Sequence, residues 1–213
     1  MKKVNRVNNH RGKVIFWLVA IVLVIIIGFG IRGVKDHFDH VTQIRQEQND
    51  PQLQQQRHDK QFMRTIAVPA IKTYRKNYQI LPSIVIAQAI VESNWGTSKL
   101  YKTANNPFGI KGSYHGRSVT YETAEYEKGK KVTIKAAFRK YPSLGAAILD
   151  HDHALSKGFI HRRHVMSYIT DAKLLQKNHY ATDPNYAKKL INVIKQYHLN
   201  RYDLEALNGK STY

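Results

Sequence analysis

A helix that is apolar on nearly every side has to be buried, and residues 84–91, "IVIAQAIV", predict such a helix. Leu81, Pro82 and Ser83 would open it, because proline is tolerated in the first helical turn. Gly96 would end it. Glu92 stands at the end of the apolar run and needs either a partner or a purpose there.

Further helices are predicted on both sides of this segment. Apolar residues at helical spacing indicate a helix over residues 62–74, in which Pro69 should produce a kink or a break. Residues 143–155 and 185–197 show helical patterns as well. Asp183 and Pro184 would then supply the cap and the first helical position of the last helix.

The period changes between residues 114 and 141, where "SVTYETAEYE" and "VTIKAAFRKY" predict two strands joined by the turn "KGKK". Alternate residues of a strand share one face. One face of the first strand would therefore carry Val119, Tyr121, Thr123, Glu125 and Glu127, and the other Thr120, Glu122, Ala124 and Tyr126.

The N-terminal region contains an uncharged run of 18 residues, 14–31. A helix of that length spans roughly 27 Å, which is close to the hydrocarbon thickness of a bilayer. We therefore predict an uncleaved transmembrane signal-anchor, with a cleaved signal peptide as the alternative. The basic residues that precede it favour a cytoplasmic N-terminus: Lys2, Lys3, Arg6, Arg11 and Lys13.

This interpretation divides the chain into a cytoplasmic basic tail (1–13), the anchor (14–31), a glutamine-rich stalk (32–58) and a folded domain (59–213). The stalk would be partly helical or disordered, and Asp50–Pro51 should interrupt any helix there. The bulk of the chain would then lie outside the membrane.

The chain carries 34 Lys and Arg against 15 Asp and Glu, a net charge of +19, which indicates a polyanionic partner. An extracellular domain makes nucleic acid an implausible partner and leaves anionic lipid or anionic wall polymer. The chain has no cysteine, which excludes disulfides, thiolate nucleophiles and cysteine metal sites. The histidine groups at 151–153 and 161–164 lack a standard zinc spacing, so no metal site is predicted.

A carboxylate held beside a tryptophan in a dry pocket resists ionisation, and Glu92 precedes Trp95 closely enough for that arrangement. Such a group suits proton donation to a glycosidic oxygen. A structural glutamate paired with an arginine or capping a helix is the alternative. Glycosidic cleavage usually needs a second carboxylate, and the hairpin offers Glu122, Glu125 and Glu127, which could equally be solvated ion pairs.

Two further segments carry side chains that suit sugar binding. Residues 105–112, "NNPFGIKG", combine amides with an aromatic ring, although the same residues make an ordinary loop. Tyr186 could direct a hydroxyl into a cleft, or be a core aromatic with a solvated tip.

Taken together, five segments of residues 62–197 resemble glycoside hydrolase family 73, the N-acetylglucosaminidases that cut bacterial peptidoglycan. They are "LPSIVIAQAIVESNWGTSKL", "NNPFGIKG", "TAEY", "FRKYPSLGAAILDHDHAL" and "YATDPNYAKKL", in the family's order. The resemblance implies a mostly helical α+β, lysozyme-like fold with a small β-hairpin lobe, here preceded by the transmembrane helix. It implies no cofactor and no metal.

The resemblance also assigns roles. Glu92 matches the family's catalytic acid, and Glu125 matches its second carboxylate in preference to Glu122. Tyr186 matches a tyrosine that borders the reactive sugar. Positions expected to line or shape the cleft match Trp95, Asn106, Phe108 and Gly109.

The implied reaction is hydrolysis of the β-1,4 bond on the reducing side of N-acetylglucosamine. Glu92 would protonate the leaving oxygen, and Glu125 would activate water or stabilise the oxocarbenium-like state, unless the substrate's own acetamido group attacks. The partners would be peptidoglycan glycan strands and anionic wall polymers. The rival hypotheses are a lytic transglycosylase or muramidase on the same fold, a non-catalytic wall-binding module, and a basic protein that binds lipid head groups.

Overall fold

The computed structural model describes the backbone of residues 8–127, 130–161 and 166–209. Side chains are described for these residues except 8–12, 19–29, 31, 47, 124–127 and 130–132. Two compact units make up the chain, Met1–Arg57 and His58–Tyr213, and each is described by itself.

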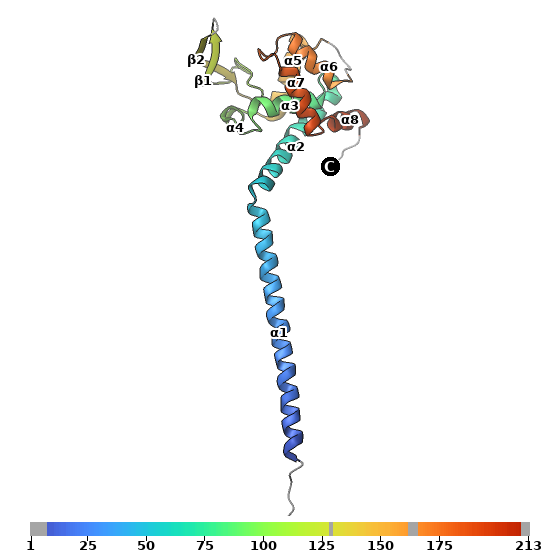
Figure 1. Ribbon diagram of the computed structural model, residues 1–213. Helices are drawn as coiled ribbons and strands as arrows, with labels where there is room; N and C mark the ends of the chain where they lie inside the picture. Colours follow the sequence, from blue (N-terminus) through green and yellow to red (C-terminus); the bar gives the residue numbers. More distant parts are fainter. Residues whose placement is uncertain (1–7, 128–129, 162–165, 210–213) are drawn as a thin grey trace, which may run out of the picture. The chain divides into compact units, whose positions relative to one another are not determined.

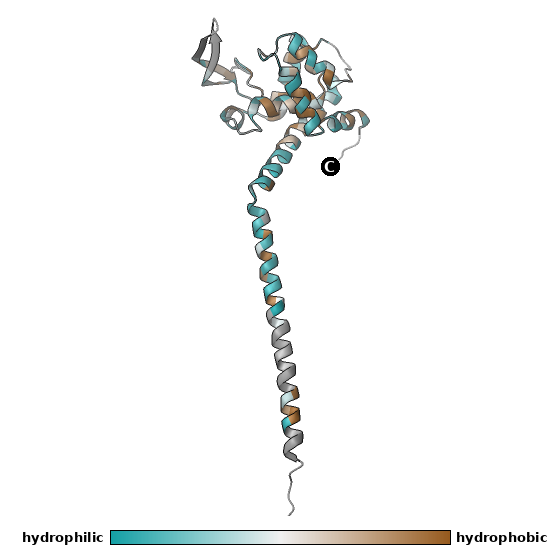
Figure 2. Cartoon of the chain, viewed as in Figure 1, coloured by the Kyte–Doolittle hydropathy of each residue, from teal (hydrophilic) through white to brown (hydrophobic). Residues whose placement is uncertain are grey.

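The first unit is largely one helix, α1 (Asn8–Asn49), which covers the uncharged run 14–31 and continues into the glutamine-rich segment. The large apolar side chains from Val14 to Leu18 are exposed. Figure 2 colours part of the described N-terminal stretch of α1 brown, as apolar. Within the part of the chain that the structure describes, no helix is both long and apolar enough to span a membrane.

Asp50 separates α1 from the next helix, α2 (Pro51–Asn77), as the Asp50–Pro51 pair predicted. Its carboxylate oxygen Oδ1 accepts a hydrogen bond from the backbone N–H of Gln52 (2.8 Å), which caps the new helix. Proline at the first helical position costs nothing there, because that N–H would have no partner in the helix.

In the second unit, the helices pack together and a two-stranded antiparallel sheet stands at one side of them (Figure 1). After α2 the elements are α3 (Pro82–Ser93), α4 (Lys99–Ala104), β1 (Ser118–Glu127), β2 (Lys130–Arg139), α5 (Leu144–Gly158), α6 (Tyr168–Lys177), α7 (Tyr186–Gln196) and α8 (Asn200–Asn208). The predicted helices at 84–91, 143–155 and 185–197 and the predicted hairpin are all present.

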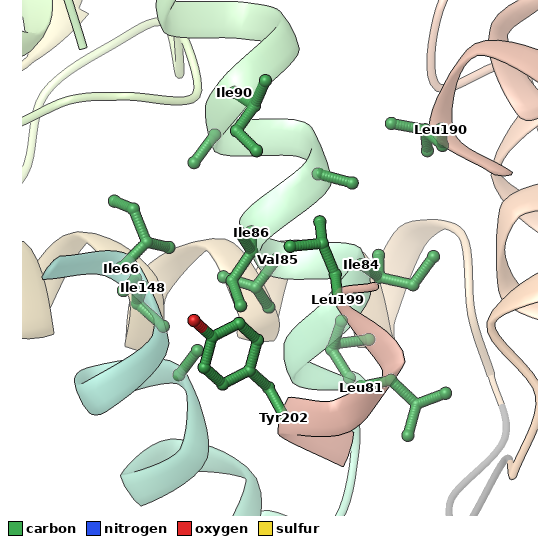
Figure 3. Packing of buried hydrophobic residues seen from close by; sticks show 14 of the residues in the cluster. Ile66, Leu81, Ile84, Val85, Ile86, Ile90, Ile148, Leu190, Leu199 and Tyr202 are labelled. Carbon is green, nitrogen blue, oxygen red and sulfur yellow. The ribbon is translucent and has the colours of Figure 1, made fainter. Parts of the chain in front are cut away.

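Helix α3 is the centre of the core, as its apolar sequence predicted. Every residue from Pro82 to Ile90 is buried, and the helix packs against α6, α7 and α8. Figure 3 shows side chains from several other helices gathered around it, among them Ile66, Ile148, Leu190 and Tyr202. Burial of large aliphatic side chains stabilises a fold by about 1.5–3 kcal/mol each, so this helix carries much of the stability of the unit.

Pro69 neither ends nor divides α2, which runs through it as one helix, so of the two predicted outcomes, a kink or a break, the break does not occur. An interior proline costs about 3 kcal/mol because it removes a hydrogen bond and crowds the preceding turn. Here the residues on both sides are anchored in the core: Ile66, Ala67, Ala70 and Ile71 are at most 4% exposed. Tertiary packing therefore holds the helix together across the proline.

The entry to α7 also differs from the prediction. The helix begins at Tyr186, so Asp183 and Pro184 form a turn before it instead of its cap and first residue. Asp183 accepts a hydrogen bond from the N–H of Asn185 (2.8 Å) and pairs with Lys189 (2.8 Å). The turn thus remains tied to the helix through a side chain one turn further on.

Candidate active site

Glu92 lies at the carboxyl end of α3, where the chain leaves the core. The next residues turn sharply: Asn94, Trp95 and Gly96 all have left-handed backbone angles, with φ of 48°, 58° and 72°. A Cβ on Gly96 would lie 2.5 Å from the ring of Phe62, so only glycine fits against that buried ring. This tight exit leaves Glu92 at the end of a rigid, buried helix.

Three side chains from α3 and α7 form a hydrogen-bonded chain. The hydroxyl of Tyr186 donates to Oε1 of Glu92 (2.8 Å) and accepts from Nε2 of Gln88 (3.1 Å). Gln88 precedes Glu92 by one helical turn, so both point from the same face of α3. Tyr186 and Gln88 are buried, and they hold one carboxylate oxygen of Glu92 in a defined place.

The surroundings raise the pKa of Glu92 above its ordinary value, and the largest cause is partial desolvation of the carboxylate by the protein. The hydrogen bond from Tyr186 and the positive charges of His151 and Lys189 oppose that rise. Glu92 nevertheless keeps contact with solvent, and its residue is exposed. The expectation of a dry pocket is therefore corrected: the protein partly desolvates the Glu92 carboxyl group, yet solvent reaches the side chain.

Burial and the nearby carboxylate of Glu92 also raise the pKa of both Tyr186 and Tyr180, whose rings lie 5.5 Å apart. Tyr186 therefore stays a neutral phenol and acts as a hydrogen-bond donor to Glu92 at any physiological pH. Tyr186 is thus a buried aromatic residue whose hydroxyl group donates a hydrogen bond to the carboxylate of Glu92.

Trp95 contributes to an aromatic cluster. Its ring packs edge-on against Phe62 (6.3 Å between centroids) and Tyr197 (4.8 Å). Its carbonyl oxygen lies 2.8 Å from Nε2 of His58. These contacts give Trp95 a clear part in stabilising the turn that follows Glu92.

Asn106 holds its own loop in place through side-chain hydrogen bonds. Its amide nitrogen donates to the carbonyls of Ile110 (3.0 Å) and Arg139 (2.9 Å), and its amide oxygen accepts from the N–H of Ile110 (3.1 Å). Both N–H groups are therefore used, and the residue is 1% exposed. In this structure Asn106 shapes the loop and ties it to β2, and its amide N–H groups are not free to bind a sugar.

Phe108 is buried as well, and its ring stacks on His151 of α5 at 3.8 Å with an interplanar angle of 15°. Gly109 is exposed, with a φ of 68° and open space where a Cβ would stand. Phe108 and Gly109 thus place the loop beside α5, and Gly109 is the one of the two that a ligand could approach.

The hairpin carboxylates are placed by the strand register. Glu122 is exposed and pairs with Lys135, whereas position 125 pairs with Val132 nearer the turn. The side chains of Glu125 and Glu127 lie outside the described residues. The backbone puts position 125 on the same face of β1 as Tyr121, and Glu122 on the other.

Sequence reasoning missed two residues near Glu92. Gln88 was visible only as a polar residue in an apolar helix, one turn before Glu92. His151 was considered only as part of a histidine cluster, yet it is buried, stacked on Phe108, and close enough for its charge to influence Glu92. Among the described residues, no group of three or more histidines and acids could hold a metal ion; His164 lies outside them.

Comparison with known proteins assigns the chain to one family. The family model for glucosaminidases, described as mannosyl-glycoprotein endo-β-N-acetylglucosaminidase, matches residues 68–199. The chain is 43% identical over 149 residues to exo-glucosaminidase LytG of Bacillus subtilis, covering 67% of this chain and 52% of that protein. It is 38% identical over 162 residues to a probable N-acetylmuramidase of Lactococcus lactis, covering 70% and 36%.

Among solved structures, the catalytic domain of the autolysin Auto from Listeria monocytogenes superposes with a TM-score of 0.62 at 39% identity, covering 68% of this chain and 87% of that one. The chain thus spans about half the length, or less, of the curated relatives named above. Its mostly helical fold with a small two-stranded sheet is the lysozyme-like fold of these domains. The chain belongs to the glucosaminidase family of the glycoside hydrolases, family 73.

Proposed function

We propose that the chain hydrolyses the β-1,4 bond on the reducing side of N-acetylglucosamine in peptidoglycan, with Glu92 as the general acid. The observation that carries this proposal is the hydrogen bond from Tyr186 to Glu92, together with the raised pKa of that carboxyl group. A carboxyl group whose pKa is raised keeps its proton to a higher pH and can deliver it to a departing glycosidic oxygen.

In the proposed mechanism Tyr186 occupies one carboxyl oxygen of Glu92, so the proton is presented from the other. As the glycosidic bond breaks, the leaving oxygen takes this proton and positive charge develops on the sugar ring. Glu125 activates the attacking water or stabilises that charge, or it leaves the attack to the substrate's acetamido group. Two carboxylates on separate lobes allow the glycan strand to lie between them.

A second candidate is cleavage on the other side of the disaccharide. It is favoured by one observation, that the Lactococcus lactis relative is named a probable N-acetylmuramidase. Relatives also differ in mode, since the family description reads endo- and the Bacillus subtilis relative is named an exo-enzyme. Mass spectrometry of digested peptidoglycan distinguishes the bond, because our proposal requires N-acetylglucosamine at the new reducing ends.

The chain would act from the membrane. Residues 14–31 are uncharged, α1 is helical throughout them, and basic residues precede them, which supports a signal-anchor with the second unit on the cell-wall side. The net charge of +19 would concentrate the enzyme at anionic wall polymers. Binding to purified walls that is unchanged in high salt would contradict this electrostatic part.

The central test compares the full chain with Glu92→Gln on purified peptidoglycan. Glu92→Gln should lower kcat by about 100- to 10,000-fold, because it removes the acid and keeps the side-chain shape. Glu122→Gln is the matched control on the opposite face of the hairpin from position 125, and it should keep most of the activity. Equal activity in the wild type and Glu92→Gln would remove Glu92 from the mechanism.

A further inference from the structure

The hairpin β1–β2 is joined to the helices mainly at its base. Arg139 pairs with Asp150 of α5 (2.6 Å), and its N–H donates to the carbonyl of Ile110 (2.9 Å). The N–H of Gly112 donates to the carbonyl of Ala137 (2.8 Å). These contacts hold the end of the hairpin farthest from its turn, so they leave the rest of the hairpin free to tilt.

One described contact lies further along the hairpin. The hydroxyl of Tyr121 is 2.7 Å from Oγ1 of Thr103 on α4, and the ammonium of Lys99 lies 5.2 Å from the centre of the Tyr121 ring. Tyr121 pairs with Ala136 and thus lies three positions beyond Ser118, which opens the strand. It fastens the hairpin to the helix that follows the Glu92 turn.

The direction of this hydrogen bond follows from the donors available. The single hydroxyl proton of Thr103 is donated to the carbonyl of Lys99 (2.8 Å). Oγ1 of Thr103 is then the acceptor, and the Tyr121 hydroxyl is the donor. Thr103 and Tyr121 therefore form a specific pair. Either hydroxyl group can be removed by itself, while the ring of Tyr121 and the methyl group of Thr103 are kept.

The face of β1 that this pair turns toward the helices is the one that includes position 125. Positions 121 and 125 are four positions apart and therefore share a face, about 13 Å apart along the strand. Glu122 belongs to the opposite face and pairs with Lys135. Docking of Tyr121 on α4 thus sets which face of β1 lies toward the helices, and position 125 belongs to that face.

We propose that Tyr121 is a positioning residue for the hydrolytic reaction: its bond to Thr103 holds the hairpin so that position 125, and not Glu122, faces Glu92. This inference rests on the proposed function. Without the bond, the hairpin pivots about its base and the second carboxylate is out of place for part of the time. Glycan binding by the helical lobe is largely retained.

The kinetic test is a double-mutant cycle with Tyr121→Phe, Thr103→Val and the double variant in the full chain. Each should lower kcat about three- to tenfold with KM changed less than twofold, as expected for one lost hydrogen bond. The double variant should lose no more than Thr103→Val alone, because Thr103→Val already removes the bond to Tyr121 together with the bond that Thr103 donates to Lys99. The matched control is Thr120→Val, an exposed threonine on the other face of β1, which should leave kcat unchanged.

A second readout does not depend on activity. The chain has no cysteine, so thiol-reactive spin labels attach only to cysteines that are introduced. We choose Lys135→Cys on β2 and Lys173→Cys on α6. The distance distribution between the labels should broaden with Tyr121→Phe and stay narrow with Thr120→Val. An unchanged distribution, or a kcat for Tyr121→Phe equal to that of an active wild type, overturns the inference. An inactive wild type whose distribution broadens with Tyr121→Phe removes the proposed function and supports the hydrogen bond as a constraint on the hairpin.

Discussion

The phenolic oxygen of Tyr186 lies 2.8 Å from Oε1 of Glu92 and joins the first turn of α7 to the last turn of α3. The two residues are 94 positions apart in the chain. A buried phenol that cannot ionise thus orients the one carboxylate that the central helix presents to solvent. The pH dependence of the enzyme should follow from this pair.

Tyr186→Phe tests that relationship. A hydrogen bond donated to a carboxylate favours its ionised form, so losing the bond raises the pKa of Glu92 further. The basic limb of the pH–rate profile should move to higher pH, while kcat falls about tenfold because the carboxyl group is less well oriented. Tyr180→Phe, which keeps the Tyr186–Glu92 bond, should leave the limb in place. A basic limb that moves to lower pH would contradict the proposed role.

Asn106→Ala tests whether this residue clamps its loop or binds sugar. Removing the amide leaves the partly buried carbonyls of Ile110 and Arg139 without those donors, so the free energy of unfolding should fall by about 2–3 kcal/mol. Urea denaturation measures the loss. Asn185→Ala is the control, because Asn185 makes no side-chain cap bond at α7. Unchanged stability with a raised KM would instead support direct contact with the glycan.

Gly96→Ala should be destabilising for two reasons, a φ of 72° and a Cβ that meets the ring of Phe62 at 2.5 Å. That ring packs against Trp95 and Tyr101 and cannot easily move away. We expect a loss of about 2–4 kcal/mol. Gly109→Ala measures the cost of the left-handed backbone alone, since the φ of Gly109 is 68° and nothing lies within 4 Å of the added Cβ. Equal losses in the two variants would show that the ring contact is harmless.

Asp171 makes the stability of the domain depend on pH. Burial, followed by the charge of Asp203, raises its pKa from 3.8 to about 7, and neither carboxyl oxygen has a hydrogen-bond partner among the described residues. Between about pH 4 and pH 7 the folded state holds a proton that the unfolded state has released. Stability should therefore fall as the pH rises through this window.

Asp171→Asn removes this titration and should raise the free energy of unfolding at pH 8 by about 1 kcal/mol, with a smaller effect at pH 4. Chemical denaturation at the two pH values measures the difference. Asp39→Asn, at an exposed position of α1, is the control for the lost charge. If Asp171→Asn lost as much stability between pH 4 and pH 8 as the wild type does, Asp171 would not be the source of the pH dependence.

Much of the fold follows from local pattern. The all-round apolar run predicted the central helix α3, and strand periodicity predicted both strands of the hairpin. Of the kink or break predicted at Pro69, the break does not occur, because the buried residues that flank the proline offset its local cost. The cap of α7 was misplaced by two residues for a similar reason: the Asp183 side chain bonds within the preceding turn and to Lys189.

The candidate site divides in the same way. The residue types and their order were enough to single out Glu92 and Tyr186 and to indicate the family. A carboxylate in an apolar helical segment can be recognised from the amino-acid sequence alone. The sequence could not show that Asn106 is occupied by its own loop, that Phe108 stacks on His151, or that Tyr121 bonds to Thr103. Periodicity specifies which face of an element is buried, but a side chain's partner depends on how distant elements pack, and only the tertiary structure decides that.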